Sequence, residues 1–183
     1  ENTENLQILR RQLIQKLQKQ KENALVLDEL LVWLYWHQGK TEQAVNQEFA
    51  IDKKYKLKGK RLLSVAQICS ENQAFDLGLD VLSKLTKQGE TSPYYRFALE
   101  QSLELKTKQL EAFPEEEETL KTSLKTDFEQ YFSTYPKSGE NITSQYLYAK
   151  FTSRFLEDDS AAISTLEQAL AFQANSKELA ECN

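Results

Sequence analysis

Apolar residues recur every three or four positions along most of the chain, a spacing that predicts amphipathic α-helices. In the first such stretch, residues 3–20, the apolar positions are Leu6, Leu9, Leu13 and Leu17, and Lys and Gln fill the other face. The same spacing predicts further helices over residues 23–37, 41–55, 60–72, 74–87, 93–112, 114–135, 142–156 and 159–172. Leu30 in the helix 23–37 and Phe97 in the helix 93–112 are among the apolar positions expected to face the core. No segment carries a strand signal, so the pattern predicts an all-α protein whose helices are joined by short turns.

Composition supports the same fold class. The chain has 183 residues with only 5 Gly and 3 Pro, against about 13 and about 9 at average usage. Turn-rich β folds need more of these residues. Gly39, Gly59 and Gly89 fall where the helical pattern stops, as expected of residues that end helices.

Two of the predicted helix pairs are similar to each other. Ala44 and Gly78, both small residues in a second helix, are 34 residues apart, which is a repeat period typical of stacked helix pairs. At the same offset Leu31 aligns with Val65, Tyr35 with Cys69, and Ile51 with Leu85. We expect these aligned positions to point inward in both pairs.

This helix–turn–helix period resembles the tetratricopeptide repeat (TPR) family. Leu31, Tyr35, Gly39 and Ala44 match the family pattern in the first pair, and the last pair carries a similar series at Tyr146, Ala162, Leu166 and Ala169. Asp28 stands where the family prefers Trp, and Glu48 where it prefers an aromatic residue. The resemblance implies a TPR-like α-solenoid of about four antiparallel pairs plus a leading helix, as one continuous domain over residues 1–183.

The chain begins with Glu1 and contains no Met, so we interpret it as a piece of a longer protein. The segments LVWLYWHQGKTEQAV and SPYYRFALEQSLELK also look similar to parts of large multi-TPR proteins of the Bacteroidetes. That resemblance implies a periplasmic or cell-envelope location, and without it the expectation is cytoplasmic.

Charge and chemistry exclude several classes of function. The net charge is −5, without the basic excess typical of nucleic-acid binders, and no apolar run reaches the length of a membrane span. One histidine and two cysteines show no metal-ligand spacing, and no phosphate-binding or nucleophile motif occurs. The carboxylates at residues 115–118 suit a helix start. We therefore expect no enzyme activity, metal or cofactor, and a small buried thiol at Cys69.

Two tryptophans next to the histidine form the candidate binding site. Trp33 and Trp36 are three residues apart on a predicted helix, and His37 follows. One interpretation places them in a groove that binds a protein partner, because Trp is the commonest anchor of protein interfaces. The other packs them against residues 3–20. The TPR resemblance extends the expected groove to Gln67, Glu71, Gln101 and Glu104.

A basic run spans the end of the predicted helix 41–55 and the turn that follows it. Its cations are Lys53, Lys54, Lys56, Lys58, Lys60 and Arg61, with Tyr55 among them. We interpret it as a solvated loop at a helix end, where Lys complements the dipole; nucleic-acid or lipid-headgroup binding is the alternative. Some TPR proteins hold the C-terminal carboxylate of a peptide with Lys and Asn side chains in the groove. At the equivalent positions of this chain, only Lys60 carries such a side chain.

These observations favour a non-catalytic scaffold that presents a concave helical groove to a peptide or partner protein of unknown identity. Two alternatives stay open. The segment is a structural spacer whose end faces stack, or it is the regulatory domain of an enzyme elsewhere in a longer chain.

Overall fold

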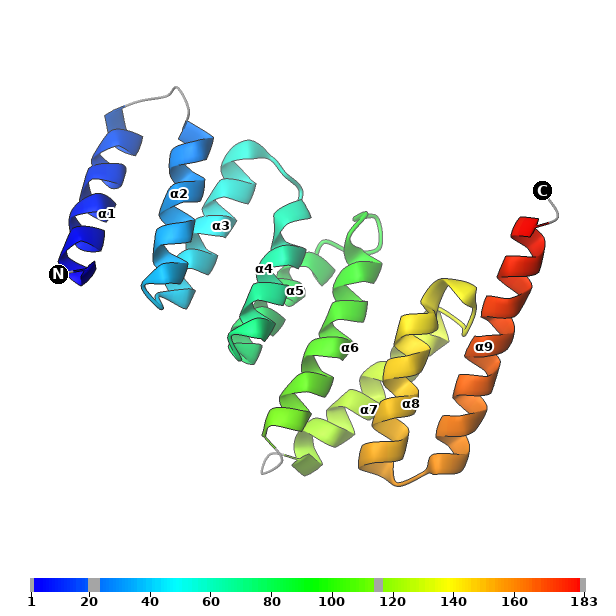
Figure 1. Cartoon of the computed structure of the whole chain (residues 1–183). Helices are drawn as coiled ribbons and strands as arrows, with labels where there is room; N and C mark the ends of the chain where they lie inside the picture. The colour runs from blue at the N-terminus through cyan, green and yellow to red at the C-terminus, as the bar shows by residue number, and fades with distance from the viewer. Residues whose placement is uncertain (1, 20–23, 114–116, 182–183) are drawn as a thin grey trace. The chain divides into compact units, whose positions relative to one another are not determined.

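All of the described secondary structure is helical (Figure 1). The computed structural model describes residues 2–19, 24–113 and 117–181. Its elements are α1 (Asn2–Lys19), α2 (Ala24–His37), α3 (Thr41–Tyr55), α4 (Lys60–Glu71), α5 (Phe75–Thr86), α6 (Tyr95–Ala112), α7 (Glu117–Thr134), the 3₁₀ turn η2 (Gly139–Asn141), α8 (Ile142–Leu156) and α9 (Asp159–Glu181). The all-α prediction is confirmed for these residues. The expected helix start at Pro114 lies outside them, and α9 continues beyond the predicted end at residue 172.

Each helix packs mainly on its neighbour in sequence. Contacts join α1 to α2, α2 to α3, α3 to α4, α4 to α5, and α8 to α9. The chain divides into two compact units, residues 1–98 and 99–183. The first turn of α6 is counted with the first unit. The expectation of one continuous domain stays a prediction.

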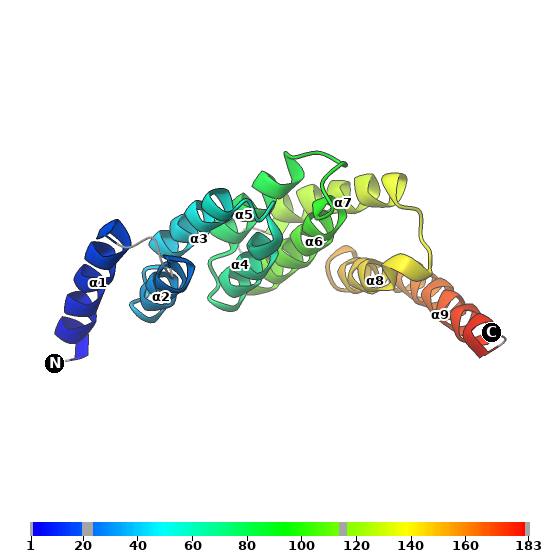
Figure 2. The same cartoon turned by 90° about the horizontal axis from the view of Figure 1, so that it is seen from above.

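In the first unit, α2 and α4 lie in one layer and α3 and α5 in the other (Figure 2). The aligned small residues Ala44 and Gly78 are both buried, where α3 meets α2 and where α5 meets α4. Leu31, Val65 and Cys69 are buried as well, so the inward register read from the sequence is correct at these positions. Small side chains at matching places let both helix pairs approach closely.

A buried carboxylate joins α2 to α3. Asp28 is 4% exposed, although its place in the pattern is one where an aromatic residue was implied. Its two oxygens accept hydrogen bonds from Gln47 Nε2 at 3.0 Å, Lys54 Nζ at 2.7 Å and Tyr55 Oη at 3.1 Å. The bond to Asp28 raises the pKa of Lys54. All three partners come from α3, so Asp28 fixes that helix against α2.

A second carboxylate cluster joins three helices. Glu48 of α3 is buried, and its carboxylate accepts hydrogen bonds from Nε and Nη2 of Arg61 at 2.9 Å and 3.0 Å. Nη1 of the same guanidinium bonds to Glu29 of α2. Hydrogen bonding to Glu48, and secondarily to Glu29, raises the pKa of Arg61. Because the planar guanidinium offers donors in fixed directions, Arg61 of α4 sets the mutual placement of α2, α3 and α4.

The turn between α3 and α4 is held in an unusual backbone conformation. Lys56, Lys58 and Gly59 all have positive φ, at 55°, 57° and 89°. Between the lysines, Leu57 packs on the cluster formed by α2 and α3. The Gly59 N–H donates to Asp52 Oδ1 at 2.8 Å. A Cβ at Gly59 would collide with the buried Leu85 of α5, so this position requires glycine for space as well as for φ.

An aromatic cluster forms the core of the second unit. Phe128 of α7 and Phe151 of α8 are fully buried, with ring centroids 5.5 Å apart, and Tyr148 meets Phe128 edge-on at 5.3 Å. Leu103 and Leu110 of α6 complete the centre of this cluster. The apolar faces of α6, α7 and α8 therefore share one core, and α9 packs on α8.

A polar corner connects α7 to α8. Asn141 is buried, and its amide nitrogen donates to the carbonyls of Tyr135 and Pro136 at 3.0 Å and 3.1 Å. The buried Gln145 donates to Asn141 Oδ1 at 2.8 Å and to the Ser138 carbonyl at 2.7 Å. The triplet Asn141-Ile142-Thr143 matches the N-glycosylation pattern. In the folded chain, however, both donors of this amide are already used.

Two apolar residues that the helical spacing placed inward are exposed instead. Leu30 of α2 was expected to face the core, yet its neighbour Leu31 is the buried one. Phe97 of α6 is exposed as well. Both lie at the edge of a broad apolar face, where spacing alone does not decide which side chains a neighbouring helix covers.

Gly59 offers a direct test of the turn between α3 and α4. We expect Gly59→Ala to lower the free energy of unfolding by about 3 kcal/mol, combining the left-handed φ with the collision at Leu85. Gly89→Ala is the matched control, because Gly89 has a φ of 81° and nothing within 4 Å of an added Cβ. It should lose only about 1–2 kcal/mol. Urea unfolding followed by circular dichroism measures both, and equal losses would contradict the packing described here.

Candidate functional site

A stripe of exposed apolar side chains runs along α2. Val26, Leu30 and Trp33 are 60%, 38% and 46% exposed, and His37 continues the line. Their spacing of four, three and four residues places them on one face of the helix. We call these four residues the α2 stripe. Exposed apolar groups in a row, on a helix that buries its other side, are typical of interaction surfaces.

The stripe could not be predicted from the sequence, because α2 is apolar on nearly every side. Val32 and Leu34 are buried on the inner face, next to exposed Trp33. A helix that is hydrophobic all round gives no periodic signal of which face is solvated. Trp33 and His37 were recognised as candidates from their residue types. Val26 and Leu30 were missed, although their spacing from Trp33 was visible.

Trp33 and His37 form one unit within the stripe. Their ring centroids are 3.9 Å apart at an interplanar angle of 34°. His37 Nδ1 lies 3.0 Å from the backbone carbonyl of Trp33, which holds the imidazole over the indole. One face of the indole is therefore covered, while the side chain as a whole stays 46% exposed. Helix α1 packs on α2 but leaves Trp33 exposed, so the two tryptophans are not both buried against residues 3–20.

Trp36 lies in a different environment. It is half-buried and packs against the cluster formed by Val32, Ala44 and Ile51 between α2 and α3. Three residues along a helix correspond to about 60° of rotation, so Trp33 and Trp36 fall on opposite sides of the boundary between solvent and core. Trp36 thus contributes to packing, and Trp33 is the tryptophan available to a partner.

The equivalent face of α4 is polar. At the 34-residue offset, the α2 stripe corresponds to Lys60, Ser64, Gln67 and Glu71, and all four are exposed. Gln67 Nε2 donates to Glu71 Oε1 at 3.3 Å. The contact between Glu29 and Arg61 places α4 next to α2. Gln67 and Glu71 therefore lie on a helix that neighbours the stripe, as expected, and present hydrogen-bonding groups beside its apolar ones.

Gln101 and Glu104 belong to the second unit. Both lie on α6 and are half-buried. Glu104 pairs with Lys108 at 2.8 Å on the same helix, and Gln101 Oε1 is buried and accepts no hydrogen bond from the residues that the structure describes. The structure does not join these two residues to the stripe, so their part in a common groove stays a prediction.

Other candidate chemistry gives weaker sites. Cys69 is fully buried, and burial raises its pKa to about 11, so the thiol is a packing group as expected. Burial also lowers the pKa of Lys137, whose Nζ donates to Thr165 and lies 5.1 Å from the Tyr148 ring centre. Within the described ranges no cluster of His, Cys, Asp or Glu could hold a metal ion, and no helix is long and apolar enough to cross a membrane.

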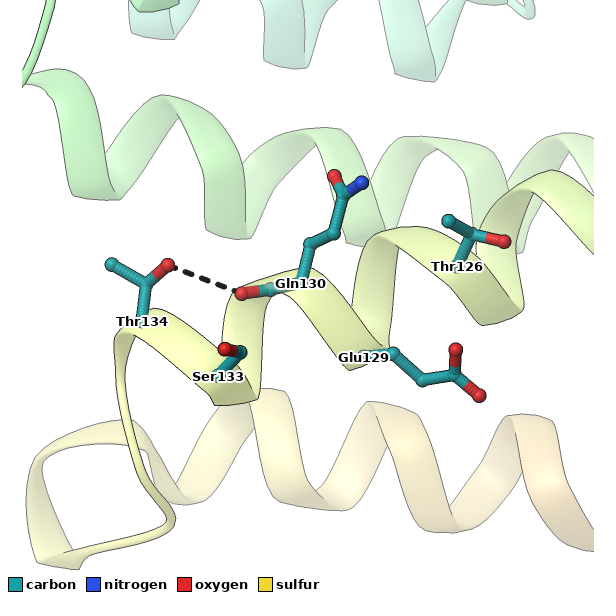
Figure 3. A pocket seen from close by; sticks show the side chains of 5 residues that line it. All are labelled: Thr126, Glu129, Gln130, Ser133 and Thr134. Carbon is teal, nitrogen blue, oxygen red and sulfur yellow. Dashed lines mark hydrogen bonds between the residues drawn. The ribbon is translucent and has the colours of Figure 1, made fainter.

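Two surface depressions occur in the second unit. One lies along α7 and is lined only by Thr126, Glu129, Gln130, Ser133 and Thr134 (Figure 3). Its side chains point to solvent from a single helix, and Thr134 Oγ1 donates to the carbonyl of Gln130 at 3.2 Å. The other is an apolar groove between α8 and α9, where Tyr146, Ile163 and Leu166 meet. Two charged groups also line this groove, and both have partners: Asp159 accepts from Ser153 Oγ at 2.6 Å, and Lys150 pairs with Glu111 at 2.7 Å.

Comparison with known proteins adds no further assignment. No protein-family model matches the chain, and no curated protein or solved structure is significantly similar to it.

Tryptophan fluorescence tests the placement of the two indoles. We expect Trp36→Phe, which retains only Trp33, to emit at longer wavelength and to be quenched more strongly by acrylamide than Trp33→Phe, because Trp33 is the more exposed indole. Circular dichroism of both variants controls for folding. Indistinguishable spectra and quenching would contradict the separation of the tryptophans described here.

Proposed function

We propose that this chain is a non-catalytic protein-binding module built from TPR-like antiparallel helix pairs. The observation that carries the proposal is the α2 stripe, in which Val26, Leu30 and Trp33 remain exposed beside a well-packed core. Two further features support the TPR-like arrangement. Matching positions of α2–α3 and α4–α5 are buried at a 34-residue offset, and helices pack on their neighbours in sequence.

The stripe has the composition of a peptide-docking surface. A partner helix or extended segment could bury Leu30 and the open part of Trp33, while Gln67 and Glu71 on the adjacent helix supply polar contacts. In protein interfaces, a few buried anchor residues, often aromatic, usually contribute most of the binding free energy, and polar groups surround them. The rigid helical backbone adds affinity because little entropy is lost on binding.

Selection of a random peptide library on the purified protein tests the proposal. We expect enriched peptides to bind the wild type and to lose about 2 kcal/mol, or roughly thirtyfold in Kd, with Leu30→Ser/Trp33→Ser. The matched control is Ser64→Ala, at the position of α4 equivalent to Leu30 on the polar face, which should leave binding unchanged. Melting temperatures measured for all variants should stay close together, because the substituted side chains are exposed.

The proposal would be overturned if no peptide is enriched above a control protein, or if enriched peptides bind the serine variant as tightly as the wild type. In either case the α2 stripe would not be a docking surface.

The second candidate function is a structural spacer with stacking faces. It is favoured by α9, whose Ile163, Leu166 and Leu170 are exposed on one face at a spacing of three and four residues. Helical repeats bury such faces on the next repeat. A spacer would use this surface of α9 and would not need the α2 stripe.

Sedimentation across a range of concentrations separates the two functions. A spacer should self-associate reversibly, and Ile163→Ser/Leu170→Ser should abolish the association while Leu30→Ser/Trp33→Ser does not. If the protein stays monomeric at concentrations of about 100 μM, where an interface of roughly 5.5 kcal/mol would be half-occupied, the spacer function is not supported.

A further inference from the structure

The lysines of the turn between α3 and α4 are not explained by the packing of the first unit. Lys56, Lys58 and Lys60 are exposed, and none forms an ion pair within the part of the chain that the structure describes. The neighbouring basic residues differ, because Lys54 pairs with Asp28 and Arg61 with Glu48. We call Lys56, Lys58 and Lys60 the lysine turn.

Stability alone would favour other residues in this turn. Lys56 and Lys58 both adopt the left-handed conformation, which costs an L-residue with a long side chain more than it costs Gly or Asn. The backbone is nonetheless fixed, because the partly buried Leu57 packs against the cluster between α2 and α3, the Leu57 N–H donates to the Asp52 carbonyl at 3.0 Å, and Gly59 is held against Leu85. The turn therefore presents its lysines from a rigid frame.

The electrostatics at this end of α4 are positive. The first turn of α4 contains no acidic residue to complement the helix N-terminus, which carries a partial positive charge. Three carboxylates of α2 and α3 near this end already have partners, since Glu29 and Glu48 bind Arg61 and Asp52 accepts the Gly59 N–H. The charges of the lysine turn therefore remain available to an anionic ligand.

The lysine turn lies beside the start of the α2 stripe. Leu57, between two of the lysines, packs on the same apolar cluster as Leu25, which directly precedes Val26. One turn further along α2, Glu29 bonds to Arg61, which directly follows Lys60. Figure 1 shows the start of α2 and the turn between α3 and α4 at the same end of these helices. Apolar and cationic groups thus adjoin on one surface.

We propose that the partner segment bound by the α2 stripe is an acidic amphipathic helix, whose apolar residues cover Val26, Leu30 and Trp33 while carboxylates at one end meet the lysine turn. This inference rests on the proposed function and adds the chemistry of the ligand. An apolar row at three-and-four spacing is complemented by the same spacing on a partner helix, and charge complementarity fixes its direction.

A single-stranded nucleic acid is disfavoured as the occupant, although lysines beside a tryptophan are common in such sites. Tyr55 directly precedes Lys56, but its ring is half-buried, its hydroxyl donates to Asp28 at 3.1 Å, and Lys54 Nζ lies 5.1 Å from its ring centroid, so it is not open for base stacking. The aliphatic Val26 and Leu30 of the α2 stripe offer no ring either. His37 already covers one face of the Trp33 indole. These groups fit the aliphatic side chains of a helix better than a row of bases.

The test uses the peptide library selected on the wild-type protein, together with the variant Lys56→Asn/Lys58→Asn/Lys60→Gln. Asn accepts the left-handed conformation more readily than Lys, so this variant should melt at or above the temperature of the wild type. We expect the enriched peptides to combine three-and-four apolar spacing with Asp and Glu toward one end. They should bind the lysine variant on the order of tenfold more weakly at low salt, and less so as salt rises.

The outcomes separate this inference from the proposed function. If enriched peptides depend on Leu30 and Trp33 but carry no acidic excess and bind the lysine variant equally, the docking function stands and the acidic ligand is refuted. If no stripe-dependent peptide is enriched, both fail. A fluorescent oligo-uridine that binds the wild type more tightly than any enriched peptide, and loses that affinity in the lysine variant, would also overturn the inference in favour of nucleic acid.

Discussion

The guanidinium of Arg61 is the contact that organises the first unit. It lies at the start of α4 and binds carboxylates of α2 and α3 at the same time, one of them buried. Removing two charges from water is expensive unless the geometry is good and all hydrogen-bonding groups are satisfied. Arg61 and Glu48 meet this condition with two parallel bonds, so the helices have one favourable arrangement. Asp28 adds a second set of buried hydrogen bonds between α2 and α3.

These charges stand where the TPR resemblance implied large apolar side chains. Asp28 and Glu48 are nevertheless buried, so their positions are inward and only the chemistry differs. Aromatic residues at these positions would stabilise the helix pair by burying apolar surface. Paired carboxylates instead contribute mainly by fixing how the helices align with each other. The same polar contacts anchor α4 beside α2, and thereby place the lysine turn next to the α2 stripe. The candidate surface is thus a consequence of how the interior is held together.

Features of the fold that depend on local sequence patterns could be predicted, and features that depend on contacts between helices could not. Helix positions were predictable because three-and-four spacing repeats over many residues, and the turns at Gly39 and Gly59 because positive φ favours glycine. The site was only partly predictable. Trp33 was singled out by its residue type, yet Leu30 was assigned to the core, and Trp36 to the same face as Trp33. On a helix that is apolar all round, residue type cannot show which side a neighbour will cover.

The sequence by itself determined an all-α chain, the approximate helix bounds, the inward register of Ala44 and Gly78, and the lack of known catalytic motifs, because all of these depend on local spacing and composition. Only the tertiary structure decided that Asp28 and Glu48 are buried, that Trp33 is exposed while Trp36 packs against α3, and that Leu57, between Lys56 and Lys58, packs on the same cluster as Leu25 at the start of α2. The physical reason is that burial and pairing depend on which helices meet. In this chain that is set by contacts between residues such as Glu29 and Arg61, which lie on different helices.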